Sequence, residues 1–372
     1  MHVGYAAAFQ NPNNAVPDDE LMRQEVRFCE MAEPLGFESI WAAEHHFTDY
    51  TLSPDTVQFL TYMAGRTTHA KLGSMVVVLP WHDPMRVAEQ VSLIDHLSNG
   101  RYILGLGRGL ARVEYEGFRV DQNEGRDLFV ENAELVLNAL EKGYMEGGAH
   151  AKQPRRDIRP FPARSFRGRT YAAAVSPESM PIMAKLGVGV LIIPQKPWHM
   201  VKEEFEIYSR VWRETNSSEP PRPLAMAFAF VDENKDRAQE LGMKYIGDYN
   251  KSVLKHYEML SEKFGTHRSY EYYSNVSKFM QNQSIEDLNR GFVNLMPYGT
   301  PEQVLEKYAM MKDATDLAGT MVVLGYGGMP YDEMERNIRC FARHVLPELK
   351  QWPAPPLVEP APLPRPNSAR AA

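Results

Sequence analysis

Short apolar segments alternate with amphipathic segments along most of this chain. The first apolar segment ends at Phe9. After it comes an amphipathic run with apolar side chains at Leu21, Val26, Met31 and Leu35, and the run stops at Gly36. This pattern predicts a buried strand followed by a helix that packs one face against it.

The same alternation recurs along the chain about eight times. Further strands are predicted at 39–43, 71–79, 102–106, 170–174, 188–193, 224–230 and 320–324. Helices are predicted between them at 54–66, 84–97, 123–145, 177–186, 198–215, 234–249, 301–313 and 332–344. Short apolar strands joined by helices form parallel sheets, and eight such units close naturally into a barrel. We therefore predict an α/β fold, a (β/α)8 TIM barrel with insertions, with an open doubly wound sheet as the alternative.

The chain divides into one large domain and a tail. We expect residues 1–346 to form a single barrel domain, with an irregular insertion near 250–291. Residues 347–372 hold eight prolines in 26 positions, a composition that cannot bury a core and favours extended conformations. We interpret this stretch as a Pro-rich C-terminal tail that either drapes over a partner subunit or is disordered.

Composition narrows the class of protein. With 372 residues, 44% apolar and 24% charged, the chain is long enough to bury a sizeable core. Its net charge of −7 has the wrong sign for a nucleic-acid binder, so small-molecule chemistry is expected. Cys29 and Cys340 cannot make a disulfide framework, and no apolar run approaches the ~20 residues of a membrane span. The N-terminus lacks a signal-peptide pattern, so we expect a cytoplasmic protein that binds neither nucleic acid nor membrane.

Titratable side chains directly follow the second predicted strand. Reacting groups in a barrel lie at the carboxyl ends of the strands, where Glu44, His45 and His46 stand. Such side chains suit acid–base chemistry or a metal, with His82 as a further ligand. Neighbouring strand residues point to opposite sides, so His45 and His46 do not readily share one metal. Catalysis or cofactor contact is the favoured interpretation, and a structural hydrogen-bond network is the alternative.

A glycine-rich motif, Gly-Leu-Gly-Arg-Gly-Leu at 105–110, follows the fourth predicted strand. It lacks the third glycine of the dinucleotide fingerprint and follows the wrong strand for it. Arg108 within the motif and Arg126 at the start of the next helix offer guanidinium groups that match a phosphate. Ser176 and Ser179 stand at a strand-to-helix turn, where backbone N–H groups also bind anions. Together these residues predict a phosphate pocket.

Six arginines crowd into the segment 155–169. The surrounding stretch, rich in Arg and Pro, is predicted to be a loop. It is either an electrostatic lid over an anionic cofactor or a solvated connection between two barrel elements.

Five short motifs, taken in order, resemble one known family. They are Glu-His-His-Phe-Thr at 44–48, Val-Val-Leu-Pro at 77–80, Asp-Pro-Met-Arg at 83–86, Leu-Ser-Asn-Gly-Arg at 97–101 and Gly-Arg-Gly-Leu at 107–110. Their order and spacing resemble the bacterial luciferase-like flavin-dependent monooxygenases, including the alpha subunit of luciferase. The likeness covers Val3 to about Pro194 well and resumes around 299–302.

The resemblance implies a (β/α)8 barrel that binds reduced FMN at its mouth. In that family reduced FMN reacts with O2 to give a C4a-(hydro)peroxyflavin, which inserts one oxygen atom into a small organic substrate. The chain carries no recognisable nicotinamide site, so a separate flavin reductase is implied as the partner that supplies FMNH2. The resemblance also implies a homodimer formed through helices beside the second and third strands.

The resemblance assigns roles to individual residues. His45 corresponds to the family's catalytic histidine, and Glu44 is taken with it as catalytic. The residues implied to contact the cofactor are Met75, Val76, Arg108, Leu110, Arg126, Val175, Ser176 and Ser179. A non-prolyl cis peptide bond is implied between Met75 and Val76. The candidate substrate contacts are Phe47, Trp81 and His82, and no residue is assigned to a metal.

The chain also departs from luciferase. Gly107 replaces a reactive cysteine, Val175 a glutamate near the phosphate, and Pro194 an aromatic residue near the ring, so light emission from a long-chain aldehyde is not expected. Hydroxylation, epoxidation and Baeyer–Villiger oxidation all stay open. The alternatives are a deazaflavin-dependent hydride-transfer oxidoreductase on the same barrel, a flavin-binding protein without turnover, and a barrel hydrolase. The hydrolase would hold its metal with Glu44, His45 and His82.

Overall fold

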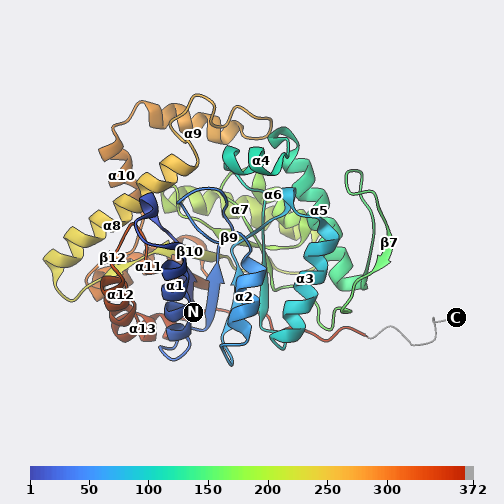
Figure 1. The fold of residues 1–372 in the computed structure, drawn as a ribbon, viewed down its shortest axis with the longest axis horizontal. Coiled ribbons are helices and arrows are strands. Elements are labelled where there is room, and N and C mark those ends of the chain that lie inside the picture. Colours follow the sequence, from blue (N-terminus) through green and yellow to red (C-terminus); the bar gives the residue numbers. More distant parts are fainter. Residues whose placement is uncertain (365–372) are drawn as a thin grey trace.

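Eight parallel strands close into a barrel in the computed structural model, which describes residues 1–364 (Figure 1). Around the ring the strands are β1 (His2–Ala7), β2 (Ser39–Ala42), β3 (Lys71–Ser74), β5 (Tyr102–Gly107), β8 (Thr170–Ala173), β9 (Gly189–Ile192), β10 (Leu224–Phe228) and β13 (Gly319–Val323). The ring closes because β1 pairs in parallel with both β2 and β13. The predicted TIM barrel is confirmed, and the open doubly wound sheet is excluded.

Helices surround the barrel (Figure 1). Those that follow the strands are α1 (Asp18–Ala32), α2 (Thr56–Ala64), α3 (Pro84–Leu97), α5 (Gly125–Lys142), α6 (Ser179–Leu186), α7 (Trp198–Thr215), α8 (Lys235–His256), α11 (Pro301–Thr315) and α12 (Tyr331–His344). α3 has the predicted bounds because the Asp83 carboxylate caps it, accepting the Arg86 N–H at 3.0 Å. Among the described residues, no helix is both long and apolar enough to cross a membrane.

Large side chains fill the interior of the barrel. Trp41 on β2 is fully buried and lies across the neighbouring strands. A β-carbon at Gly4 or Gly73 would come within 2.7 Å of its ring, so both positions leave room for the indole. The Trp41 Nε1–H donates to the Ser39 hydroxyl at 2.7 Å. Packed side chains therefore fill the barrel interior, and we expect the functional site at the carboxyl ends of the strands.

The third predicted strand is divided in the structure. β3 ends at Ser74, and β4 (Val77–Val78) continues beside β5. Between them a non-prolyl cis peptide bond joins Met75 to Val76, at the position that the resemblance implied. The backbone therefore changes course at the end of this strand, on the side where the barrel opens.

The insertion near 250–291 is more regular than predicted. α8 runs on to His256, and α9 (Glu271–Gln281) and α10 (Ile285–Val293) follow it. Figure 1 shows both helices at the end of the barrel where α4 (Arg112–Phe118) also lies. The prediction of an irregular segment was wrong because each of these short helices buries only one or two side chains, so its apolar repeat is short.

The arginine-rich segment does not cover the barrel mouth. The segment begins in an antiparallel hairpin that β6 (Tyr144–Gly147) and β7 (Gln153–Asp157) form. The buried Arg169 lies 2.5 Å from Asp95 and donates to the carbonyl oxygen of Tyr102 at 2.8 Å. Arg164 lies near the same Asp95 carboxylate, and three more arginines lie near other carboxylates: Arg155, Arg159 and Arg167. The lid interpretation is wrong, because the Arg169 contacts lie at the amino ends of the strands and none of the six described arginines lines a cavity at the carboxyl ends.

The described part of the Pro-rich tail packs on its own chain. Its first residues, 347–351, belong to α13 (Leu346–Gln351) and are helical rather than extended as predicted, and the stretch after them runs beside the segment before β8. The Ser165 N–H donates to the Ala361 carbonyl oxygen at 2.8 Å, and the Leu363 N–H donates to that of Ala163 at 2.9 Å. The disordered alternative is therefore wrong for 347–364, and a contact with a partner subunit stays a prediction. The rest of the predicted tail, 365–372, lies outside the described residues.

Candidate active site

Two adjoining cavities open at the carboxyl ends of the strands. The smaller, of about 140 Å³, is lined by Arg108, Arg126 and Ser179 among others. The larger, of about 780 Å³, has a mostly apolar lining. Six residues line both: His45, Met75, Ile193, Gln195, Tyr257 and Tyr273. The cavities are therefore parts of one site with a polar end and an apolar end, and His45 lies where they meet.

Two arginines at the polar end point at one oxygen atom. Arg108 Nη1 donates to the backbone carbonyl oxygen of Ser269 at 2.8 Å, and Arg126 Nη2 donates to the same oxygen at 3.0 Å. The buried Nε–H of Arg126 has no hydrogen-bond partner among the described residues. Burial lowers the pKa of Arg126, and the charge of Arg108 lowers it further. Two like charges and an unused donor in one place favour an anionic ligand.

The predicted serines stand at the start of α6. Ser179 lines the smaller cavity. Ser176 is buried, and its hydroxyl oxygen lies 2.9 Å from that of Ser179, so this hydrogen bond helps to orient the Ser179 hydroxyl. The other predicted cofactor contacts also line the smaller cavity: Met75, Val76, Leu110 and Val175. The structure thus brings this set together, and the roles assigned to its members stay predictions.

Glu44 accepts hydrogen bonds from several neighbours. Its Oε1 accepts from Trp81 Nε1 at 2.7 Å and lies 2.8 Å from His82 Nε2. The same oxygen lies 3.1 Å from His46 Nε2, and Oε2 accepts the Val78 N–H at 3.0 Å. Burial raises the pKa of Glu44, but these hydrogen bonds outweigh burial and hold the pKa below its usual value. The carboxylate therefore ties the end of β2 to the segment around β4.

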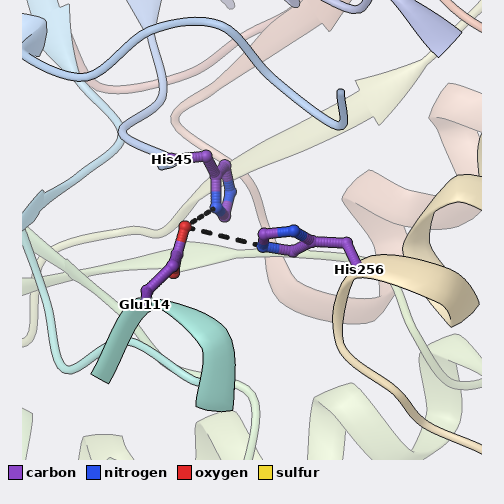
Figure 2. A group of neighbouring side chains, drawn as sticks. All are labelled: His45, Glu114 and His256. Carbon is purple, nitrogen blue, oxygen red and sulfur yellow. Dashed lines mark hydrogen bonds and ion pairs between the residues drawn. The ribbon is translucent and has the colours of Figure 1, made fainter. Parts of the chain in front are cut away.

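A second carboxylate holds His45. Glu114 on α4 places Oε1 2.9 Å from His45 Nδ1 (Figure 2). His256, the last residue of α8, points Nε2 at the same oxygen from 3.5 Å. The metal group considered from the sequence, Glu44 with His45 and His82, is not formed because His45 is turned toward Glu114.

Both histidines in Figure 2 face the same carboxylate oxygen of Glu114. Burial raises the pKa of Glu114, but the charge and hydrogen bond of His45 and the nearby His256 ring hold that pKa well below its usual range. Burial lowers the pKa of His256, whose Nδ1 lies 2.8 Å from the Thr48 hydroxyl. With Glu114 ionised, His45 Nδ1 donates to it, and Nε2, which lies 3.4 Å from the Tyr257 hydroxyl, is left to exchange a proton.

The spacing of this group also suits a divalent metal ion. One ligand atom from each of His45, Glu114 and His256 lies within 4.8 Å of the others. The direct hydrogen bond between His45 and Glu114 satisfies that pair without a metal. The geometry therefore supports proton transfer at His45 without a need for a metal ion at this group.

The three predicted substrate contacts lie outside the lining of both cavities. Phe47 is 60% exposed and packs against Phe118. Trp81 stacks on Phe118 and donates to Glu44, to which His82 is also bonded. These side chains pack against Phe118 and Glu44 outside the cavities, so the cavities give no support for their predicted role as substrate contacts. The lining of the larger cavity comes instead from the segment after β9 and from α8, α9 and α10.

Sequence reasoning missed Glu114 and His256. Glu114 follows closely after the predicted phosphate motif at 107–110, so its place beyond a strand end was a usable signal. His256 lies in the segment predicted as an irregular insertion. No local pattern there indicates that the end of a helix faces the barrel mouth.

Comparison with known proteins assigns this chain to a family. Residues 1–317 match the family model described as luciferase-like monooxygenase. The chain belongs to the luciferase-like monooxygenase family. It is 25% identical to the alkanal monooxygenase alpha chain of Photorhabdus luminescens over 337 residues, which cover 89% of this chain and 93% of that protein. The resemblance inferred from the motifs is confirmed.

Two solved structures have the same barrel fold as this chain, and the name of each gives a different cofactor. The oxygenating constituent of 3,6-diketocamphane monooxygenase from Pseudomonas putida, solved with FMN, has a TM-score of 0.73 at 16% identity and covers 94% of this chain and 99% of its own. An F420-dependent secondary alcohol dehydrogenase, solved with an F420–acetone adduct, has a TM-score of 0.67 at 16% identity and covers 93% and 98%. These likenesses show the fold alone.

Proposed function

We propose that this chain is the oxygenase of a two-component flavin-dependent monooxygenase. It would bind reduced FMN and use O2 to insert one oxygen atom into a small organic substrate. The observation that carries the proposal is the junction at His45 between an arginine-lined cavity and an apolar cavity. The first suits a phosphate-bearing cofactor and the second an organic substrate.

The residues of the smaller cavity fit the phosphate of FMN. Arg108 and Arg126 bring two positive charges, the buried Nε–H of Arg126 is a donor without a partner, and Ser179 adds a hydroxyl at a helix start. The wall beside the Met75–Val76 bond is closely packed, since a β-carbon at Gly107 would come within 2.2 Å of Val76. When bound, reduced FMN supplies the electrons that activate O2.

His45 is the residue to which we assign proton transfer. Glu114 holds its Nδ1, so Nε2 is free to accept or donate a proton at the junction. The apolar lining of the larger cavity keeps bulk water away from that atom. These two features support an oxygen-transfer site, which needs both a proton carrier and a dry environment.

The placement of basic residues favours FMN over a deazaflavin. The deazaflavin cofactor has a longer and more anionic tail, for which the arginines at 155–169 were candidates. Arg169 is buried against Asp95 at the amino ends of the strands, and Arg167 lies near Glu141. None of the six arginines at 155–169, all of them within the described residues, lines the smaller cavity that Arg108 and Arg126 line.

A separate flavin reductase is part of the proposal. The diketocamphane enzyme is named as the oxygenating constituent of a monooxygenase, a wording that fits a division of labour between proteins. We extend the same division to this chain and propose that it receives FMNH2 from such a partner. We also propose that the chain acts as a homodimer.

The test compares the two reduced cofactors without oxygen. Reduced FMN and a reduced deazaflavin are titrated separately into the protein, and we expect reduced FMN to bind and the deazaflavin not to. The complex is then mixed with O2, and the return of oxidised-flavin absorbance is followed by stopped flow. We expect the protein to change the rate of this return relative to free FMN, and His45→Ala to change it again.

Each contrary result has a definite meaning. Binding of the deazaflavin but not of reduced FMN would overturn the proposal in favour of hydride transfer. Reoxidation at the rate of free FMN would leave a flavin-binding protein without oxygenase activity. If His45→Ala reoxidises as the wild type does, His45 has no part in the chemistry.

A further inference from the structure

The larger cavity offers no free charge to a ligand. Among the described residues that line it, Lys196 and Asp287 are the only Lys, Arg, Asp or Glu side chains. Lys196 Nζ is buried and donates to Glu204 at 2.6 Å and to the Val175 carbonyl oxygen at 2.5 Å. Asp287 is exposed at the edge of the cavity, where it accepts from the Ser284 hydroxyl at 2.7 Å and lies 3.6 Å from Arg290. A charged ligand would lose its hydration inside the cavity without gaining an unpaired partner there, so the cavity interior selects against charge.

Aromatic rings and thioethers make up much of the lining. Phe228 stacks on Tyr249 with ring centroids 3.8 Å apart, and the Tyr249 hydroxyl oxygen lies 2.8 Å from that of Tyr50. The methionines of the lining are Met75, Met200, Met226, Met259, Met280 and Met296. Aromatic walls offer flat contact surfaces, and methionines adapt to irregular shapes. At about 780 Å³, the cavity is large enough for a drug-sized molecule.

One residue that lines the larger cavity is a glycine, Gly291, although the surrounding packing leaves room for a side chain. Gly291 lies inside α10, where glycine is less favourable than alanine. A β-carbon there would meet no heavy atom within 4 Å. Gly291 is exposed and lines the larger cavity, as do the exposed Phe279 on α9 and Met200 on α7. We call these three positions the rim, and the missing side chain of Gly291 leaves it open.

We propose that the larger cavity binds an uncharged aromatic substrate of drug-like size, which enters across the rim at Gly291. Calling this ligand the substrate rests on the proposed function, whereas its binding does not require flavin. Gly291 is then a residue that determines specificity, because it sets how much bulk the rim admits.

The test uses two naphthalene dyes, neutral prodan and anionic ANS, with the full chain free of flavin. We expect prodan to bind with a blue-shifted emission, and ANS to bind at least about tenfold more weakly. Gly291→Phe, with Gly291→Leu as a second variant, should weaken prodan binding about tenfold, whereas Gly291→Ala should stay within about threefold of the wild type. Glu286→Phe adds the same bulk to α10 outside the cavity lining and should bind prodan as the wild type does.

Reduced-FMN affinity is measured for every variant and should be unchanged, because Gly291 does not line the smaller cavity. ANS binding as tight as that of prodan would overturn the inference, as would prodan binding that neither bulky variant weakens. Complete displacement of prodan by oxidised FMN would show that the dye had taken the place of the flavin, and would also overturn it. If reduced FMN binds none of the proteins, the proposed function fails while the dye results still decide the nature of the cavity.

Discussion

The Nδ1 atom of His45 lies 2.9 Å from Oε1 of Glu114, although 69 residues separate the two along the chain. His45 follows β2 and Glu114 lies on α4, so closure of the barrel brings them together. The buried carboxylate orients the imidazole ring and stabilises the protonated ring that proton transfer produces. This pair therefore decides which nitrogen of His45 faces the cavities.

Removal of the Glu114 charge should slow turnover. Glu114→Gln keeps an acceptor for Nδ1 but no longer stabilises the imidazolium ion, and we expect a loss of about tenfold or more. Steady-state turnover gives the rate, and the ¹⁵N chemical shifts of the His45 ring report its tautomer. Glu116→Gln, at an exposed position of the same helix, is the control. Equal turnover and unchanged ring shifts in Glu114→Gln would show that Glu114 does not position His45.

Arg126 should contribute to affinity through the phosphate. We expect Arg126→Met to weaken binding of reduced FMN about 10- to 100-fold, because a charge-assisted hydrogen bond contributes about 1.5–3 kcal/mol. Reduced riboflavin lacks the phosphate, so its affinity should change far less. Anaerobic titrations of both flavins check this, with the exposed Arg119→Met as control. An equal loss for riboflavin would mean that Arg126 acts on the ring or on the structure of the cavity.

The barrel could be predicted because its signal is local and repeated. α3 and α7 have the bounds predicted for them, since one apolar face defines each helix and Asp83 also caps α3. α9 and α10 were missed because contacts with the barrel decide where they lie. One such contact is the hydrogen bond from the Tyr270 hydroxyl, just before α9, to the Gly109 carbonyl oxygen at 3.3 Å.

The site was predictable where its residues follow strand ends or begin helices. Arg108 and Ser179 are of this kind, and a barrel brings such positions to one mouth. His256 reaches the site from the end of a long helix, which no local pattern reveals. Phe47 and His82 also follow strand ends, yet they turn toward Phe118 and Glu44, because the direction of a side chain in a loop depends on packing that the sequence does not display.

Glu25 on α1 should make stability depend on pH. Its Oε1 accepts the Phe9 N–H at 3.1 Å, its buried Oε2 has no hydrogen-bond partner within residues 1–364, and burial raises the pKa of Glu25 to about 7. The unfolded chain releases this proton near pH 4.5, the ordinary value, and the folded chain only near 7. Between these values the folded state binds more protons, so the free energy of unfolding falls as pH rises.

The expected fall from this one group is on the order of 3 kcal/mol between pH 4.5 and about pH 8. Glu25→Gln should abolish that part of the pH dependence, since the amide does not titrate. Urea unfolding at several pH values measures it, with Glu20→Gln on the same helix as the control. A variant that keeps the wild-type pH dependence would show that another group is responsible.

Two neighbouring helices carry exposed apolar side chains beside the second and third strands. Tyr62 lies on α2, Leu93 and Leu97 lie on α3, and Leu97 is 59% exposed. Burial of such side chains against a second copy removes apolar surface from water. These helices are therefore the surface that we assign to the proposed homodimer.

A double variant, Leu93→Glu with Leu97→Glu, should be monomeric at concentrations where the wild type is a dimer. The introduced carboxylates would be buried without partners, and copies of the same charge would face each other across the two-fold axis. Sedimentation velocity measures the mass of each protein. Met310→Glu changes an equally exposed apolar residue on α11, outside the assigned surface, and should remain dimeric. A monomeric wild type, or dissociation by Met310→Glu alone, would contradict an interface formed by α2 and α3.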